Sequence, residues 1–430
     1  MANQVSHGPN GIADATGKTD ILAIALDVVR QTKDITDYLR ANGLASPTFA
    51  ADTAEVPENS EYLALRIGLK ASLEDLGRLV NGPKQQLRAL CCQGYDLAAF
   101  QIAFEFDLFT LVPAQQEISL SDLAQKAGLD VDRVSRIVRL MITHRFFQER
   151  KPGFISHTAS SYVLFRDEDL RSMVAYSLDE NLKAATASAD CLRASPHESD
   201  ATHSPFYTQH GIPAYSYYDQ DPRRANRFAK AMAGAEKMGH HINRDFFPWE
   251  SLKGTVVDVG GGSGHISMAL ARRFPELDFV VQDDVIKMLD QGKALLEDDL
   301  QGRVSFMQHS FFEPQPLKDV AAFLLRQCTH NWCDRDVIAM LKGIVPGLQN
   351  SKPGTPLLIN DIIMPEAGTC PRLVERELRQ IDMIMFVAFG AKQRTEAEFR
   401  YLLKQADPRY EVRKVHAEGS QGILEVFLNY

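Results

Sequence analysis

A glycine-rich turn directly after an apolar stretch is the feature of this sequence that points most clearly to chemistry. Residues 255–259 form an apolar run typical of a buried strand. Gly260, Gly262 and Gly264 follow at alternate positions, and a helical pattern begins soon after them. Glycine lets the backbone turn sharply and approach a ligand closely. The pattern therefore predicts a site for a nucleotide-like cofactor at the carboxyl end of a strand.

Two carboxylates sharpen this prediction. Asp258 lies just before the glycines and can organise the loop or reach the amino acid part of a cofactor through water. Asp283 closely follows the next expected strand, where an acid can accept hydrogen bonds from both hydroxyls of a ribose. His265 occupies the position where a dinucleotide-binding turn needs its last glycine, so an NAD site is the weaker alternative.

A histidine follows another expected strand, in the segment Thr329-His330-Asn331-Trp332. Open α/β sheets place their ligands at the carboxyl ends of the strands, where His330 is expected. Histidine has an ordinary pKa of about 6.5, which suits it to take the proton of a phenol-like hydroxyl with a pKa of about 10. His330 is therefore the candidate general base.

Composition argues against several other classes of function. The formal net charge of −9 disfavours a nucleic-acid partner, which needs clustered Lys and Arg. No apolar run is long enough to span a bilayer, so no membrane partner is expected. The six cysteines form no CxxC pair, so neither a metal site nor a disulfide framework is predicted. Residues 1–20 lack the pattern of a secretory signal, so a disordered leader and a cytoplasmic location are expected.

The elements that precede the glycine turn are mainly helical. The expected helices span 21–44, 61–80, 86–109, 119–128 and 131–143. Asn81-Gly82-Pro83 has the chemistry of a turn, and two short extended pieces at 146–149 and 153–155 complete a winged-helix pattern. Because the protein is acidic, we expect residues 21–180 to form a dimerisation domain or a cover for the substrate rather than a DNA-binding module.

The second expected domain, 181–430, alternates strands and helices from about residue 254. The expected strands are 255–259, 279–281, 304–306, 321–325, 356–360, 410–416 and 423–428. Helices are expected at 266–273, 285–296 and 334–345, and another begins at Pro222. Five strand–helix units closed by a final hairpin indicate an open, mostly parallel sheet, which belongs to the α/β class.

The sequence resembles the plant- and fungal-type small-molecule O-methyltransferases from about Leu87 to the C-terminus. The stretches DVGGGSGH, QHSFFEPQP, LLRQCTHNWCD and GAKQRTEAEF carry the resemblance. It implies a Rossmann-like, seven-stranded class I methyltransferase domain preceded by a mainly helical, winged-helix-like dimerisation domain. It also implies S-adenosyl-L-methionine as the cofactor, S-adenosyl-L-homocysteine as the product, a homodimer and a small secondary metabolite as the substrate.

By this resemblance, the glycine turn and Asp283 hold the cofactor. Phe311 matches a position that packs on the adenine. Ser310 replaces an aspartate that usually bonds the adenine amino group, which makes that contact weaker or water-mediated. Arg326 matches a position whose backbone or side chain reaches the cofactor.

The resemblance also assigns residues to the substrate. Met232 and Met385 match methionines that line the methyl-transfer zone, although ordinary core packing explains them equally well. Asn331 stands where the family often has an aspartate after the histidine, and it is expected beside the substrate.

The family's general base matches His330. Asp361 matches one of two glutamates that orient the imidazole, and Gln393 replaces the other. A histidine held by one carboxylate and one amide can still act as a base, although it loses one negative neighbour. The predicted reaction is methyl transfer to a phenol, enol or N-hydroxyl. The alternative is a pericyclase or dehydratase of the same family that binds S-adenosylmethionine without transferring its methyl group; His330 favours transfer, whereas Gln393 and Asn331 keep the alternative open.

Overall fold

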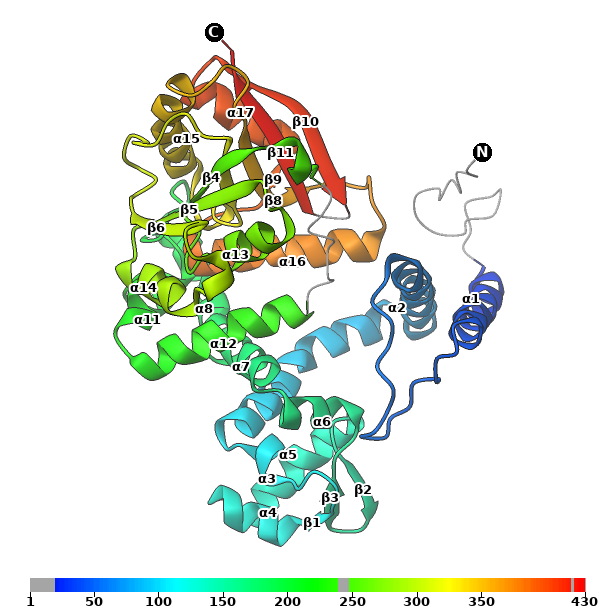
Figure 1. The fold of residues 1–430 in the computed structure, drawn as a ribbon. Helices are drawn as coiled ribbons and strands as arrows, with labels where there is room; N and C mark the ends of the chain where they lie inside the picture. The colour runs from blue at the N-terminus through cyan, green and yellow to red at the C-terminus, as the bar shows by residue number, and fades with distance from the viewer. Residues whose placement is uncertain (1–19, 239–246, 419–420, 430) are drawn as a thin grey trace. The chain divides into compact units, whose positions relative to one another are not determined.

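The computed structural model describes residues 20–238, 247–418 and 421–429, which fall into two compact units (Figure 1). The first unit contains Met1–Lys183, Tyr215–His241 and Cys370–Arg376. The second contains Ala184–Ala214, Ile242–Thr369 and Glu377–Tyr430. The sequence suggested one boundary near residue 180. In the structure each unit is built from three separate segments of the chain. The expected leader lies outside the described residues except for Asp20, its last residue.

Two long helices open the first unit. They are α1 (Ile21–Ala41) and α2 (Ser60–Glu105), and they pack against each other. The side chains of Asp20 and Asn59 cap their N-termini by accepting backbone N–H groups. Helix α2 breaks at Gly82, whose φ is 66°, just before Pro83. The predicted turn is therefore present as a sharp break in a helical path, because proline cannot donate a backbone hydrogen bond there.

A winged-helix arrangement follows. Its elements are α3 (Leu108–Leu111), β1 (Ile118–Ser119), α4 (Leu120–Ala127), α5 (Val131–Thr143), β2 (Gln148–Lys151) and β3 (Phe154–Ser156). The three strands pair in the order β1-β3-β2. Ser119 and Asp130 cap α4 and α5, and Gly128 ends α4 in the left-handed conformation that favours glycine.

Three further helices lie entirely within this unit. They are α6 (Ala159–Arg166), α7 (Glu168–Tyr176) and α12 (Pro222–Met238), and a π-helical turn spans Ser177–Asn181. Helix α12 packs along α7 so closely that a Cβ on Gly234 would lie 2.2 Å from the carbonyl oxygen of Asp169.

A twisted sheet forms the centre of the second unit (Figure 1). Its strands are β4 (Gly254–Val259), β5 (Leu277–Asp283), β6 (Val304–Gln308), β7 (Ala322–Arg326), β8 (Leu357–Met364), β9 (Arg394–Thr395), β10 (Tyr410–Glu418) and β11 (Gln421–Leu428). The spatial order is β10-β11-β8-β7-β4-β5-β6, with β9 beside β8. Strands β4 to β8 are parallel, and β11 runs antiparallel to β8. The seven expected strands are all present.

Helices cover both faces of this sheet. Helices α13 (His265–Arg273) and α14 (Ile286–Leu295) pack on one face, and α15 (Asp334–Gln349) and α17 (Glu396–Ala406) on the other (Figure 1). The sequence did not predict α17, α16 (Arg372–Phe389) or the short helices α8 (Leu182–Thr186), α9 (Ser188–Ala194), α10 (Pro205–His210) and α11 (Ala214–Asp219). Single 3-10 turns lie at Trp249–Ser251, Asp298–Leu300 and Thr329–Asn331. Among the described residues, no helix combines the length and apolarity needed to cross a membrane.

Candidate active site

The glycine turn folds back onto the end of β5. The backbone N–H groups of Gly260 and Gly261 both donate to the carbonyl oxygen of Gln282, at 2.8 and 3.0 Å. The N–H of Gly262 donates to Asp283 Oδ2 at 3.0 Å. Gly260, Gly262 and Gly264 all have positive φ, which only glycine adopts without strain. The structure thus brings the predicted turn and the predicted ribose acid into direct contact.

The buried carboxylate of Asp258 packs against the glycine turn. Its carboxylate is buried and accepts a hydrogen bond from Ser267 Oγ at 2.6 Å. A Cβ on Gly261 would lie 2.6 Å from that carboxyl group, so only glycine fits there. Burial raises the pKa of Asp258. The hydrogen bond from Ser267 lowers this pKa, but by less than burial raises it. Of its two predicted roles, the contacts of Asp258 support loop organisation.

The wall beside the turn is aromatic. The ring of Phe311 lies 3.4 Å from the position that a Cβ of Gly260 would take, and it also contacts Trp332 edge-on. Ser310 precedes it in the loop after β6 and is half-buried, as is Arg326 at the end of β7. An open turn without side chains, a carboxylate and a flat apolar wall fit a nucleoside cofactor such as S-adenosylmethionine. Sequence reasoning missed Gln282 and Gln315, whose buried amides bond each other at 2.8 and 3.0 Å and fix this loop.

His330 and Asp361 form a hydrogen-bonded pair at the carboxyl end of β7 and β8. His330 Nδ1 lies 2.6 Å from Asp361 Oδ1, and Thr329 donates its hydroxyl to Asp361 Oδ2 at 2.5 Å. The backbone N–H of Ile362 also donates to Oδ1. Asp361 is 1% exposed. Burial alone would raise the pKa of Asp361, but the charge and hydrogen bond of His330, with the other two donors, hold it below its usual value.

This pairing selects one tautomer of the imidazole. A carboxylate can only accept, so Nδ1 must carry the proton that it shares with Asp361. In the neutral ring, Nε2 then keeps its lone pair. Among the described residues Nε2 of His330 has no hydrogen-bond partner, so it is available to a substrate proton. The described residues also contain no group of three or more His, Cys, Asp or Glu able to hold a metal ion.

A buried arginine that the sequence reasoning missed holds the histidine segment in place. Arg394 donates to the carbonyl oxygens of Thr329 and Trp332 at 2.9 and 2.8 Å, on either side of His330. It also pairs with Asp334 at 2.8 Å, and its own side chain has 0% exposure. The preceding backbone is strained, because Gln327 has a φ of 48°. A signal was present, since the arginine lies within the GAKQRTEAEF stretch, but no pattern assigned it a partner.

We predict that Arg394→Met destabilises the second unit by about 3 kcal/mol, because it leaves two carbonyl oxygens without their donor and Asp334 with Lys392 as its remaining partner. Both tryptophans, Trp249 and Trp332, lie in this unit, so urea unfolding followed by tryptophan fluorescence measures the change. Arg335→Met is the matched control: its side chain is 72% exposed, and it should cost at most about 0.5 kcal/mol. Equal effects of the two substitutions would contradict the assigned role.

The contacts of the remaining predicted residues do not identify a role for them. Gln393 is buried, but among the described residues its amide bonds neither His330 nor any other group. Asn331 is half-buried in the 3-10 turn that carries His330. Met385 lies half-buried on α16 in the second unit, and Met232 lies on α12 in the first unit with 41% exposure. The roles of these residues toward a substrate stay predictions.

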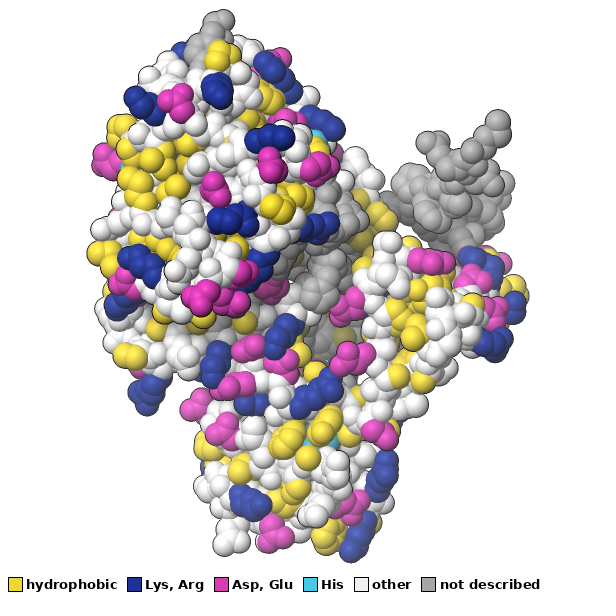
Figure 2. Space-filling view, viewed as in Figure 1, with side chains coloured by type: hydrophobic (Ala, Val, Ile, Leu, Met, Phe, Trp, Pro, Cys, Tyr) yellow, Lys and Arg dark blue, Asp and Glu magenta, His cyan; other side chains and the backbone are white. Residues whose placement is uncertain are grey.

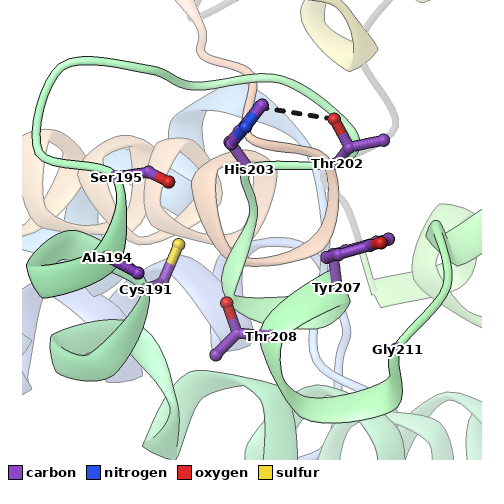
Figure 3. Close-up of a pocket in the computed structure, with 8 residues that line it drawn as sticks. All are labelled: Cys191, Ala194, Ser195, Thr202, His203, Tyr207, Thr208 and Gly211. Atoms are coloured by element: carbon purple, nitrogen blue, oxygen red, sulfur yellow. Dashed lines mark hydrogen bonds between the residues drawn. The ribbon is translucent and has the colours of Figure 1, made fainter.

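The second unit also contains a cavity of about 600 Å³ beside α9 and α10 (Figure 3). Eight residues line it: Cys191, Ala194, Ser195, Thr202, His203, Tyr207, Thr208 and Gly211. None of the predicted site residues is among them. His203 bonds Thr202 there (Figure 3), and it also bonds Asp200 at 2.9 Å. The chemistry is therefore located by the hydrogen-bonded groups at the sheet edge and not by this cavity.

The chain is similar to known O-methyltransferases in sequence. Residues 190–408 match the family model of the O-methyltransferase domain. The chain is 56% identical over 429 residues to the O-methyltransferase sol2 of Alternaria solani, covering 100% of both chains. It is 30% identical over 414 residues to the chlorophenol O-methyltransferase of Trichoderma longibrachiatum, covering 93% of this chain and 88% of that protein.

Solved structures share the fold. The crystal structure of OxaC matches with a TM-score of 0.75 at 20% identity, covering 94% of this chain and 100% of that one. The LepI complex with SAM matches with a TM-score of 0.72 at 19% identity and the same coverage. These matches confirm the predicted class I methyltransferase fold. The family model and the sequence relatives show that the chain belongs to the O-methyltransferase family and is an S-adenosylmethionine-dependent enzyme of the EC 2.1.1 type.

Proposed function

We propose that His330 is the general base that takes the proton of a substrate hydroxyl while its oxygen is methylated. The hydrogen bond between His330 Nδ1 and Asp361 is the observation that carries this proposal, because it leaves Nε2 free to accept a proton. When bound, S-adenosylmethionine supplies an electrophilic methyl group. The chain itself contributes alignment and a place for the proton. Asp361 positions the ring and stabilises the positive charge that His330 gains.

The cofactor-binding residues fit the same scheme. They are Asp258, Gly260, Gly262, Gly264, Asp283, Ser310, Phe311 and Arg326. The carboxyl ends of β4, β5 and β6 carry the turn, Asp283 and the Ser310–Phe311 loop, and His330 follows the neighbouring strand β7. The strand order changes direction at β4, which is where open α/β sheets bind their ligands.

We predict that Asp283→Asn weakens binding of S-adenosylhomocysteine about 10- to 100-fold. Both carboxylate oxygens already accept backbone N–H groups, from Gly262 and Val285, and an amide offers only one acceptor. The loss should appear by isothermal titration calorimetry. Asp284→Asn, at the adjacent exposed position, is the control and should bind as the wild type does. Equal loss in both variants would argue that net charge, and not the ribose acid, is responsible.

The substrate that we propose is a secondary metabolite with a phenol, enol or N-hydroxyl group. A chlorophenol is named for one relative, which acts on an aromatic hydroxyl by its title. An acidic hydroxyl of this kind suits a base that has one orienting carboxylate, Asp361. Because His330 keeps its proton-accepting Nε2, the site supports methyl transfer better than a rearrangement that only uses bound S-adenosylmethionine.

We also propose that the enzyme is a homodimer formed through the N-terminal helices. Apolar side chains are exposed along α1 and α2; they include Leu22, Leu26, Val29, Leu73, Val80, Leu87, Leu90 and Tyr95. Figure 2 shows apolar surface gathered over α2. Such faces usually need a cover, and a second copy supplies one. Sedimentation velocity of the full chain measures this directly. The cytoplasmic location stays a prediction.

Mass spectrometry with a deuterated methyl donor tests the proposed reaction. Purified protein is incubated with labelled S-adenosylmethionine and a metabolite extract of the host. Label on a metabolite oxygen supports methyl transfer. An unlabelled change in a metabolite, without label transfer, would favour the rearrangement alternative and overturn the proposal.

A further inference from the structure

The buried amide of Gln393 lacks the hydrogen bonds that such a group needs. Gln393 is 4% exposed, and among the described residues neither its Oε1 nor its Nε2 has a partner. Burying an amide without partners is costly, so buried polar groups in folded proteins are almost always bonded. This position therefore points to a ligand that supplies the missing bonds.

Hydrogen bonds and ion pairs hold the backbone on both sides of Gln393, so a small shift of this loop would not expose the side-chain amide to solvent. Its own backbone N–H donates to Asp382 Oδ1 at 2.7 Å. The neighbours on both sides are held as well. Lys392 pairs with Glu398 at 2.7 Å, and Arg394 pairs with Asp334. Among the residues that the structure describes, the side-chain amide between these two cations has no hydrogen-bond partner.

Strand pairing places Gln393 near the segment that carries the base. Strand β9 lies beside β8 with Arg394 level with Ile363, so Gln393 lies beside the chain just after Asp361. The proposed cofactor-binding residues lie at the carboxyl ends of β4, β5 and β6. Strand β7, which leads to His330, lies between β4 and β8. Arg394, the next residue, donates to the carbonyl oxygens of Thr329 and Trp332 on either side of His330, so Gln393 lies near the segment of the base, and we take the substrate to be the missing partner.

We propose that Gln393 recognises a second hydroxyl on the substrate: its Nε2 donates a hydrogen bond to the hydroxyl oxygen, and its Oε1 accepts a hydrogen bond from the hydroxyl. The proposal rests on the proposed function of His330 as the base. A hydroxyl can satisfy both ends of an amide, because it donates and accepts, whereas a carbonyl or an ether only accepts. Gln393 thus acts as a specificity-determining residue, and the favoured substrates are diols in which one hydroxyl is methylated and the other is bound.

Naphthalene diols provide a direct test. Binding of the ortho, meta and peri dihydroxynaphthalenes is compared with that of the matching monohydroxy naphthol by calorimetry on protein saturated with S-adenosylhomocysteine, so no turnover is needed. The proteins are the wild type, Gln393→Met, which keeps the shape, and Gln393→Glu, which keeps an acceptor but no donor. Methyl transfer to the same compounds is measured separately with the deuterated donor, in the wild type and in His330→Ala.

The wild type should bind at least one diol about 10- to 100-fold more tightly than the naphthol. Gln393→Met should bring that ratio close to one with unchanged affinity for the naphthol and for S-adenosylhomocysteine, and Gln393→Glu should restore part of it. A wild-type ratio near one for every diol, no binding by any of them, or an unchanged ratio in Gln393→Met overturns the proposal. If the ratio responds to Gln393 but His330→Ala still transfers methyl groups normally, the base assignment fails and the recognition of the second hydroxyl stands.

Discussion

His330→Ala should lower kcat for methyl transfer by about 10²- to 10⁴-fold and leave the affinity for S-adenosylhomocysteine unchanged. The alanine removes the Nε2 lone pair that would take the substrate proton. It touches none of the contacts of the glycine turn, which are made with Gln282 and Asp283. The deuterated-methyl assay measures the first quantity, and calorimetry measures the second.

His203→Ala is the matched control, because His203 belongs to the same unit and also bonds an aspartate, Asp200, at 2.9 Å. It should retain activity within a few-fold. A mild loss in His330→Ala, equal to that of the control, would mean that the substrate loses its proton to another group. A loss that disappears at high pH, where the substrate is already ionised, would agree with proton removal as the missing step.

The cofactor half of the site could be predicted because a short stretch encodes it. The glycine turn needs positive φ at alternate positions, and glycine is the residue type that tolerates this. The contact of Asp283 with the glycine turn could be predicted because the next strand of a parallel sheet must end at the same edge. Even there, the reciprocal bond between Gln282 and Gln315 could not be predicted, because it joins strand β5 to a loop 33 residues farther along the chain.

The surroundings of the base depend on contacts that no local pattern encodes. Arg394 reaches the carbonyl oxygen of Thr329, which is 65 residues away along the chain. Helix α17 was predictable from the capping box of Thr395 and Glu398, but α9 to α11 have only six or seven residues each, too few for a helical period to show. Residues 215–241 join the first unit because α12 packs on α7. The order of the elements along the sequence does not predict this packing.

Asp361→Asn is the second substitution with a large expected effect: kcat should fall by about 10²- to 10³-fold with the fold preserved. The asparagine can still place its oxygen toward His330 and the N–H of Ile362, with its amino group toward the Thr329 hydroxyl, which can accept. The ring tautomer is then kept, and only the negative charge that stabilises the protonated imidazole is lost. The double variant Thr329→Val with Asp361→Asn leaves that amino group without its acceptor, so it should be less stable than Asp361→Asn alone, while the N–H of Ile362 keeps the amide oxygen toward His330 and the tautomer is retained.

The pH dependence of stability separates this charge effect from simple misfolding. The pKa of Asp361 is lowered in the folded protein, so its stabilising contribution is complete above its unfolded pKa of about 3.9 and is lost as pH falls through the lower folded value. Wild type and Asp361→Asn should therefore differ most in urea unfolding at neutral pH and converge as the pH falls below about 4. Thr329→Val alone is the control, because it keeps the charge and should retain most of the activity. If Asp361→Asn stayed within a few-fold of wild-type kcat, the carboxylate would be a structural partner of Thr329 and not the group that supports the base.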